Sequence, residues 1–159
     1  MLSSSDTDLL VTYFLEGSDL SKAAASRLEN ELKQHPEHLH IVVKLLGFYE
    51  TRHLKSKKYG ARRKRLIRWI FENYPQHPFL SRSLPIVVKS HDQKFFDETI
   101  ELWLLQVKDN VQTAQLLINA ANHLMFHDRE LSKQFLQRAK ELEPSNTDVE
   151  RVSKRLRLI

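Results

Sequence analysis

The chain has 159 residues, 41% hydrophobic and 28% charged, which predicts one globular domain over 1–159 and argues against a disordered tail. It has no cysteine, which excludes disulfides, thiolate metal sites and a cysteine nucleophile, and its 3 glycines cannot form a glycine-rich phosphate loop. The net charge is +5, yet residues 52–68 alone carry nine positive charges and no acid, so subtracting nine leaves −4 for all other residues.

The N-terminal segment shows no targeting pattern. Residues 1–17 contain Asp6 and Asp8 and no basic residue, and the apolar run from Leu9 to Leu15 is too short to span a bilayer. No other segment approaches the required length. We therefore expect a cytoplasmic protein without membrane association.

The basic stretch LKSKKYGARRKRLIR, residues 54–68, predicts an enlarged turn at KSKKYG between two helices. In the second helix, Arg62 and Arg63 each lie one turn before an apolar residue, Leu66 and Ile67, and so extend the buried face. Buried cations need carboxylates, carbonyls or an anionic partner. The candidate residues for an anionic partner are Lys57, Lys58, Arg62, Arg63, Lys64, Arg65 and Arg68.

Helical periodicity continues to the C-terminus, and no convincing period-2 segment occurs. The segments 92–108 and 128–144 each carry an apolar stripe at helical spacing, and 147–159 opens with a capping box from Thr147 to Glu150. We expect Pro85 to interrupt a helix in the segment before residue 92.

Helix ends recur at a regular distance, at Pro36, Pro75, Asp109 and Pro144, with spacings of 39, 34 and 35. Two helices in about 34 residues predict stacked hairpins, each of which needs its neighbours to bury its apolar face. The approximate repeats and the capping helix are 3–36, 37–75, 76–109, 110–144 and 147–159.

The fourth block, AQLLINAANHLMFHDRELSKQFLQRAKELEPSN, resembles a tetratricopeptide repeat. Its first helix has the pair Asn119-Ala120, its second has Leu136 and Ala139, and Pro144 closes the unit. The second block adds Leu46-Gly47 and Tyr74-Pro75, whereas His123 stands in place of an aromatic residue and Ser132 in place of alanine. The resemblance implies an all-α, right-handed stack of antiparallel helix hairpins, an α-solenoid, with a C-terminal capping helix.

In that family, residues of the first helix line a groove that binds a peptide or helix of a partner, which implies a non-enzymatic protein-interaction module. The corresponding strip, called the α-strip below, consists of Ala114, Leu117, Ala121, Leu124 and Met125. An amphipathic helix would suit it, either from a partner or from this chain's own DLLVTYFL segment at 8–15. The sequence leaves both possibilities open.

The alternative function is electrostatic binding of RNA or DNA by residues 52–68. The C-terminal cations Arg151, Lys154, Arg155 and Arg157 could assist it. Tyr59 is the one aromatic residue within the run that could stack on a base.

Histidines and carboxylates give no site by spacing alone. His35, His38 and His40 lie together, as do His123 and His127, but neither group supplies a fixed set of zinc ligands, so we expect no metal or other cofactor. We expect a packing role for His123, and inter-repeat core positions for Trp69 and Trp103. Glu98 and Glu101 lie one turn apart without a partnering histidine, so we expect no enzyme.

Overall fold

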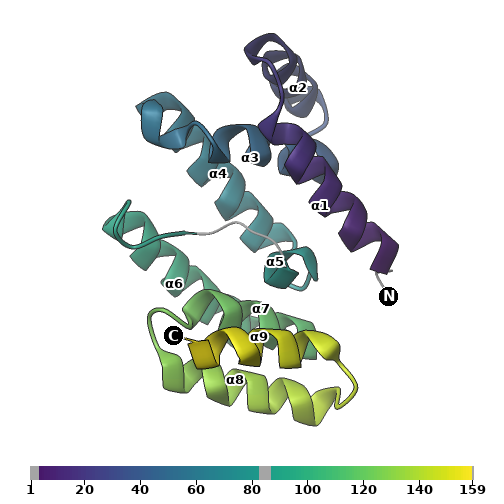
Figure 1. Cartoon of the computed structure of the whole chain (residues 1–159), viewed down its shortest axis with the longest axis vertical. Coiled ribbons are helices and arrows are strands. Elements are labelled where there is room, and N and C mark those ends of the chain that lie inside the picture. Colours follow the sequence, from purple (N-terminus) through teal and green to yellow (C-terminus); the bar gives the residue numbers. More distant parts are fainter. Residues whose placement is uncertain (1–3, 83–86, 159) are drawn as a thin grey trace. The chain divides into compact units, whose positions relative to one another are not determined.

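The computed structural model describes residues 4–82 and 87–158, and every regular element in these ranges is a helix (Figure 1). This confirms the all-α class. None of these helices is long and apolar enough to cross a lipid bilayer. The elements in chain order are α1 (Ser4–Ser18), α2 (Lys22–Gln34), α3 (Leu39–Glu50), the 3-10 turn η1 (His53–Lys55), α4 (Lys57–Asn73), α5 (Phe79–Arg82), α6 (Gln93–Asp109), α7 (Ala114–Leu124), α8 (Arg129–Leu142) and α9 (Thr147–Leu158).

The helix ends lie close to the predicted block boundaries, so each block contains two α-helices and α9 follows the fourth. The third block departs from the pattern, because its first helix, α5, is a single turn. Pro85, which was expected to interrupt that helix, lies outside the described residues. The turn predicted at KSKKYG, residues 55–60, is shorter than expected. Helix α4 already begins at Lys57, and the amide of Gly60 donates to the Ser56 carbonyl at 2.9 Å.

The chain divides into two compact units, Met1–Ile70 and Phe71–Ile159, where the sequence predicts one domain. The division falls within α4, so the second block contributes to both units. Stacking of all four blocks into one right-handed solenoid stays a prediction.

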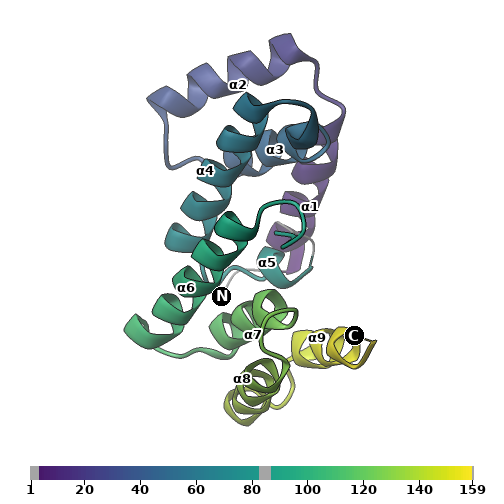
Figure 2. The same cartoon turned by 90° about the vertical axis from the view of Figure 1, so that its left-hand side faces the viewer.

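Helix α3 is the centre of the first unit. Eight of its residues are buried, from Ile41 to Tyr49 with the exception of Lys44, as is typical of a helix that is apolar on all sides. Both α1 and α2 pack on α3. Within the described part of the chain, α1 and α2 do not pack on each other as α7 and α8 do, and Figure 2 shows them apart, so the first block is not a closed hairpin.

Helices α1 and α3 touch through their backbones. A Cβ atom added to Gly47 would lie 1.9 Å from the Phe14 carbonyl oxygen, and one added to Gly17 would lie 2.0 Å from the Lys44 carbonyl oxygen. Two of the three glycines in the chain therefore allow this crossing, because any side chain there would overlap the facing helix. Next to the crossing, Lys44 pairs with Glu16 at 2.7 Å.

Arg52 fastens the ends of these two helices. Its guanidinium donates to the carbonyls of Ser18 at 3.1 Å and Phe48 at 3.0 Å, which end α1 and α3, and to that of Leu20 in the following loop at 3.3 Å. Cations stabilise the C-terminal ends of helices, where carbonyls lack intrahelical partners. One of the nine positive charges of residues 52–68 is thus structural.

Helix α7 has the corresponding place in the second unit, with α5, α6, α8 and α9 packed on it (Figure 1). Side-chain caps begin its helices at three places: Asp92 accepts from Phe95 N, Thr113 from Leu116 N, and Asp128 from Leu131 N.

A polar network holds the one-turn helix α5 against α7 and α9. The amide of buried Asn119 donates to the Pro75 and His77 carbonyls, at 2.8 and 3.0 Å. Arg155 donates to the Ser81 carbonyl at 2.9 Å, and burial followed by the charge of Arg151 lowers the pKa of Arg155. These bonds join α5 and the residues that precede it to α7 and α9.

Gly47→Ala should destabilise the first unit by about 2 kcal/mol, since α1 and α3 would have to move apart. Gly60→Ala is the matched control, because its Cβ would meet no atom closer than 3.5 Å and alanine favours a helix by up to about 1 kcal/mol. Denaturant unfolding followed by circular dichroism measures both. Equal stability of the two variants would contradict backbone contact at the crossing.

Candidate functional site

An open cleft of about 390 Å³ lies between α2, α3 and α4 in the first unit. Its floor and walls are apolar: Val42 and Leu45 come from α3, Leu66 and Trp69 from α4, and Leu32 from α2. The volume is within the range of small-molecule and side-chain pockets. We call it the α2–α4 cleft.

The cleft stays open because α2 covers it incompletely. Ala25 is the one residue of α2 that is buried, whereas its large apolar residues Leu28 and Leu32 are half-buried. Ala25 lies in the first turn of α2, and its small side chain fills little space. The apolar face of α2 is therefore a wall of the cleft and leaves its interior unfilled.

Arg62 ties α2 to α4 at one side of the cleft. Its Nη1 lies 2.6 Å from Glu29 Oε1 on α2 and 3.3 Å from the Tyr49 hydroxyl on α3, and that hydroxyl also donates to Glu29. Arg62 is half-buried and thus finds a carboxylate, one of the partners that the sequence led us to expect. Its partner belongs to the protein itself.

Arg63 is satisfied in the same way. Its side chain is 7% exposed and forms a two-point ion pair with Glu50, from Nε to Oε2 at 2.6 Å and from Nη2 to Oε1 at 3.2 Å. Bidentate pairing of this kind orients both groups as well as neutralising them. The two arginines that the sequence singled out are thus internal ties between helices.

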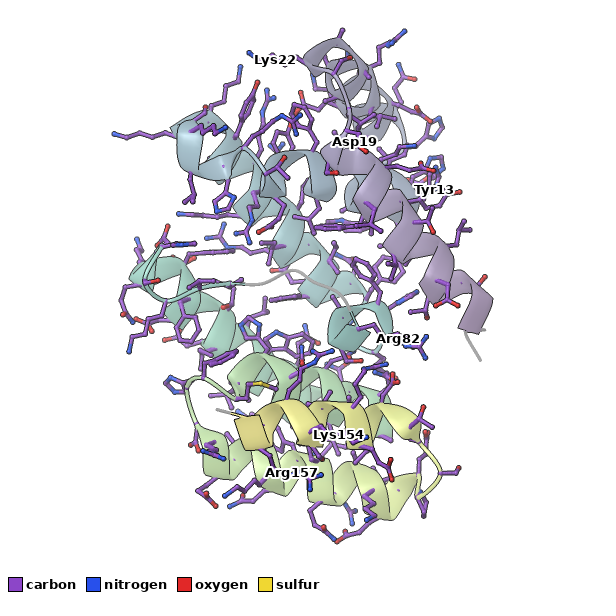
Figure 3. All side chains as sticks on the ribbon, in the orientation of Figure 1. Tyr13, Asp19, Lys22, Arg82, Lys154 and Arg157 are labelled. Carbon is purple, nitrogen blue, oxygen red and sulfur yellow. The ribbon has the colours of Figure 1, made fainter. Side chains whose placement is uncertain are left out.

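The other candidates for an anionic partner differ in exposure. Lys57, Lys58, Arg65 and Arg68 are exposed, and Lys64 is half-buried. A second hollow, of about 660 Å³, adjoins the cleft and shares Glu29 and Arg62 with it. Apart from that pair, its charged lining residues are all positive: Lys22 (Figure 3), Arg52, Lys55 and Lys58. We call it the basic hollow.

The α-strip is not an open groove. All five of its residues are buried and none is more than 5% exposed. The physical reason is that α6, α8 and α9 pack around α7 within the second unit. The DLLVTYFL segment forms most of α1 and packs on α3 of the first unit.

The C-terminal cations fall into two kinds. Arg151 pairs with Asp148 at 2.8 Å, and Arg155 donates to Asn122 Oδ1 at 2.6 Å, so both act inside the second unit. Lys154 and Arg157, on α9 in Figure 3, are exposed.

His123 has a packing role, as expected, and packs against α6 and the end of α4. Its ring contacts Phe71 and Trp103, with centroids 5.2 and 6.1 Å away, and Nε2 lies 2.8 Å from the Thr99 hydroxyl. Burial lowers the pKa of His123 to about 3, so the ring is neutral at physiological pH. Thr99 is itself buried and also donates to the Phe96 carbonyl, which gives this pair a structural role.

The two tryptophans that align in the repeats lie in different surroundings. Trp103 is 1% exposed and packs on Phe71 in the core of the second unit, as expected. Trp69 is half-buried and lines the cleft. The helical spacing of the two tryptophans in the sequence does not distinguish the cleft position from the core position.

No protein-family model, curated protein or solved structure matches the chain. The resemblance of the blocks to tetratricopeptide repeats stays an expectation based on residues such as Leu116 and Ala120, both fully buried in α7.

Arg63→Gln should lower the free energy of unfolding by about 3 kcal/mol, because it leaves Glu50 partly buried without its cation. Arg65→Gln, on the exposed side of the same helix, should change it by less than about 0.5 kcal/mol. Urea titrations of the two variants test this contrast. A stable Arg63→Gln variant would return Arg63 to the candidates for an external anion.

The stability of the second unit should fall as the pH drops from about 6.5 towards 3. The pKa of His123 is lower in the folded chain than in the unfolded chain. Between these two pKa values the unfolded chain binds a proton that the folded chain does not, so acid stabilises the unfolded state. Part of the side chain is exposed, so the slope of about 1.4 kcal/mol per pH unit is an upper limit. Unfolding curves at several pH values should show a smaller slope for His123→Leu, and an unchanged one for the exposed control His127→Ala.

Proposed function

We propose that the protein is a non-enzymatic protein-interaction module that holds a segment of a partner protein in the α2–α4 cleft. The observation that carries this proposal is the combination of an open apolar cleft with a helix, α2, whose large apolar residues are only half-buried. Exposed or half-exposed apolar side chains beside a hollow are typical of binding surfaces. We infer that side chains of the partner complete the packing that α2 leaves unfinished.

The charges around the cleft favour an acidic partner. Lys33 and Arg65 are exposed at its rim, and the carboxylate that lines it, Glu29, is already paired with Arg62. A segment that combines large apolar residues with Asp or Glu would match both the floor and the rim. An amphipathic helix presents such residues at i, i+3 and i+4, and helix-in-groove binding is a common mode of recognition.

The helix pairs support a tetratricopeptide-like interaction module rather than an enzyme. Each of the four blocks contains two α-helices, as this family implies, although the first block is not a closed hairpin and α5 in the third is a single turn. Such repeats act by presenting surfaces. The histidine–hydroxyl pair of His123 and Thr99 is enclosed by Phe71 and Trp103, which leaves it without the open pocket that a catalytic pair needs.

Electrostatic binding of RNA or DNA is the second candidate, and the basic hollow is the observation that favours it. Lys55 and Lys58 are exposed there, and Tyr59 in its lining could stack on a base. With Arg52, Arg62 and Arg63 engaged inside the protein, the number of cations for phosphates is smaller than the sequence suggests.

A display selection against the full chain should enrich peptides with large apolar residues flanked by Asp or Glu. Leu32→Asp places a carboxylate on the cleft wall at a half-buried position and should abolish their binding, and Arg65→Glu should weaken it about tenfold. Lys154→Glu makes the same charge change on α9 and should leave affinity unaltered. Circular dichroism establishes that each variant is folded.

Two outcomes would count against the cleft. Enriched peptides might bind Leu32→Asp as tightly as the original chain, or a single-stranded oligonucleotide might bind instead, with affinity that falls steeply with salt. In the second case, loss of oligonucleotide binding in Lys55→Gln/Lys58→Gln would establish the basic hollow as the functional surface.

A further inference from the structure

The turn HPEHLH, residues 35–40, connects α2 to α3 and is held by hydrogen bonds at both ends. The amide of His35 donates to the Glu31 carbonyl at the end of α2, at 2.9 Å, and that of His38 donates to the His35 carbonyl at 3.2 Å. The His38 carbonyl in turn accepts from Ile41 and Val42 at the start of α3. The backbone positions of its side chains are therefore set by the two helices.

Three potential metal ligands converge in this turn. Glu37 Oε1 lies 3.8 Å from His35 Nδ1 and 3.7 Å from His38 Nε2, and one ligand atom from each residue lies within 4.8 Å of the others. His38 Nδ1 is buried and has no hydrogen-bond partner among the described residues, so Nε2 is the nitrogen that an ion can reach. This is the one group of three histidine or acidic side chains so arranged in residues 4–82 and 87–158.

We propose that this turn binds one divalent transition-metal ion of the zinc type, with His35, Glu37 and His38 as protein ligands and water in the fourth position. Two imidazoles and a carboxylate form an established ligand set for zinc, whose bonds to such atoms are about 2.0–2.1 Å long. A tetrahedral ion with those bonds spaces its ligands about 3.3 Å apart. The distances of 3.7 and 3.8 Å to Glu37 thus need to close by a few tenths of an ångström, and the two histidine nitrogens, which lie within 4.8 Å of each other, by up to about 1.5 Å.

The side chains are able to make this adjustment. The two imidazole rings now stack, with centroids 4.8 Å apart and planes 10° from parallel, and they must tilt so that their lone pairs meet at one ion. Rotation about the terminal torsion of histidine is soft. His35 and Glu37 are exposed and His38 is half-buried, so the tilt disturbs no packed core.

His40 stacks on His38 at 5.3 Å but also lies against Tyr13, at 5.9 Å, and is outside the ligand set. His127 is exposed in the second unit. The variants His40→Ala and His127→Ala are therefore controls, because each removes an imidazole that is not a proposed ligand.

Since the ligands join the end of α2 to the start of α3, a bound ion would fasten these helices at the end of the cleft marked by Pro36. The proposal does not depend on what the cleft binds. The folded chain should bind the ion more tightly than the unfolded chain, because the two helices hold the ligands in one turn.

The test is a calorimetric titration of zinc chloride into the full chain without a histidine tag. We expect one ion per chain, a loss of affinity of at least about tenfold in His35→Ala and in His38→Ala, and little change in His40→Ala or His127→Ala. Glu37→Gln keeps the shape of the side chain but should also bind about tenfold more weakly. Zinc should raise the melting temperature of the original chain and not that of His35→Ala/His38→Ala.

An adventitious ion only would show as weak binding that His127→Ala reduces as much as His35→Ala, or as binding without a rise in melting temperature. Either result overturns the proposal. Unchanged affinity in Glu37→Gln would overturn the three-ligand site as well. Cobalt substitution gives an independent reading, because a tetrahedral site absorbs visible light more strongly than hydrated cobalt does.

Discussion

The contact between Gly17 and Gly47 is the constraint on which the first unit depends. Because no side chain separates the two backbones there, α3 lies directly against α1 and is buried on nearly all sides. Val42, Leu45 and Tyr49, which are also buried, line the cleft on another flank of α3. The crossing thus determines which face of α3 is left for α2 and α4, and with it the position of the candidate site.

Positive charge in this protein serves two different purposes. Arg52, Arg62 and Arg63 join helices, and each does so through partners fixed in geometry: helix-end carbonyls for Arg52, and carboxylates on α2 and α3 for the other two. Removal of such partly buried cations leaves acceptors without a partner, which is costly. The lysines around the basic hollow are exposed to solvent, as are Lys33 and Arg65 at the cleft, so these cations can serve an external anion without loss of stability.

The α2–α4 cleft and the HPEHLH turn share helix α2, the least buried helix of the first unit among those whose burial the structure describes in full. With one buried residue, α2 depends on its ends and on the pair of Glu29 with Arg62 for its position. A ligand that fills the cleft and an ion that joins α2 to α3 would both stabilise the same helix. Any coupling between the two sites would be reciprocal.

Periodicity, caps and breaks are local features, so the helices could be predicted from the sequence alone: each block boundary lies near the end of an α-helix, and the all-α class followed directly. It also identified Arg62 and Arg63 as residues that need partners. Helix packing selects these partners, buries the α-strip under α6, α8 and α9, and makes Trp69 but not Trp103 line a cleft. The reason is that a helical pattern shows which face of a helix is apolar, whereas the choice between a buried face and an open one depends on which other helices pack against it.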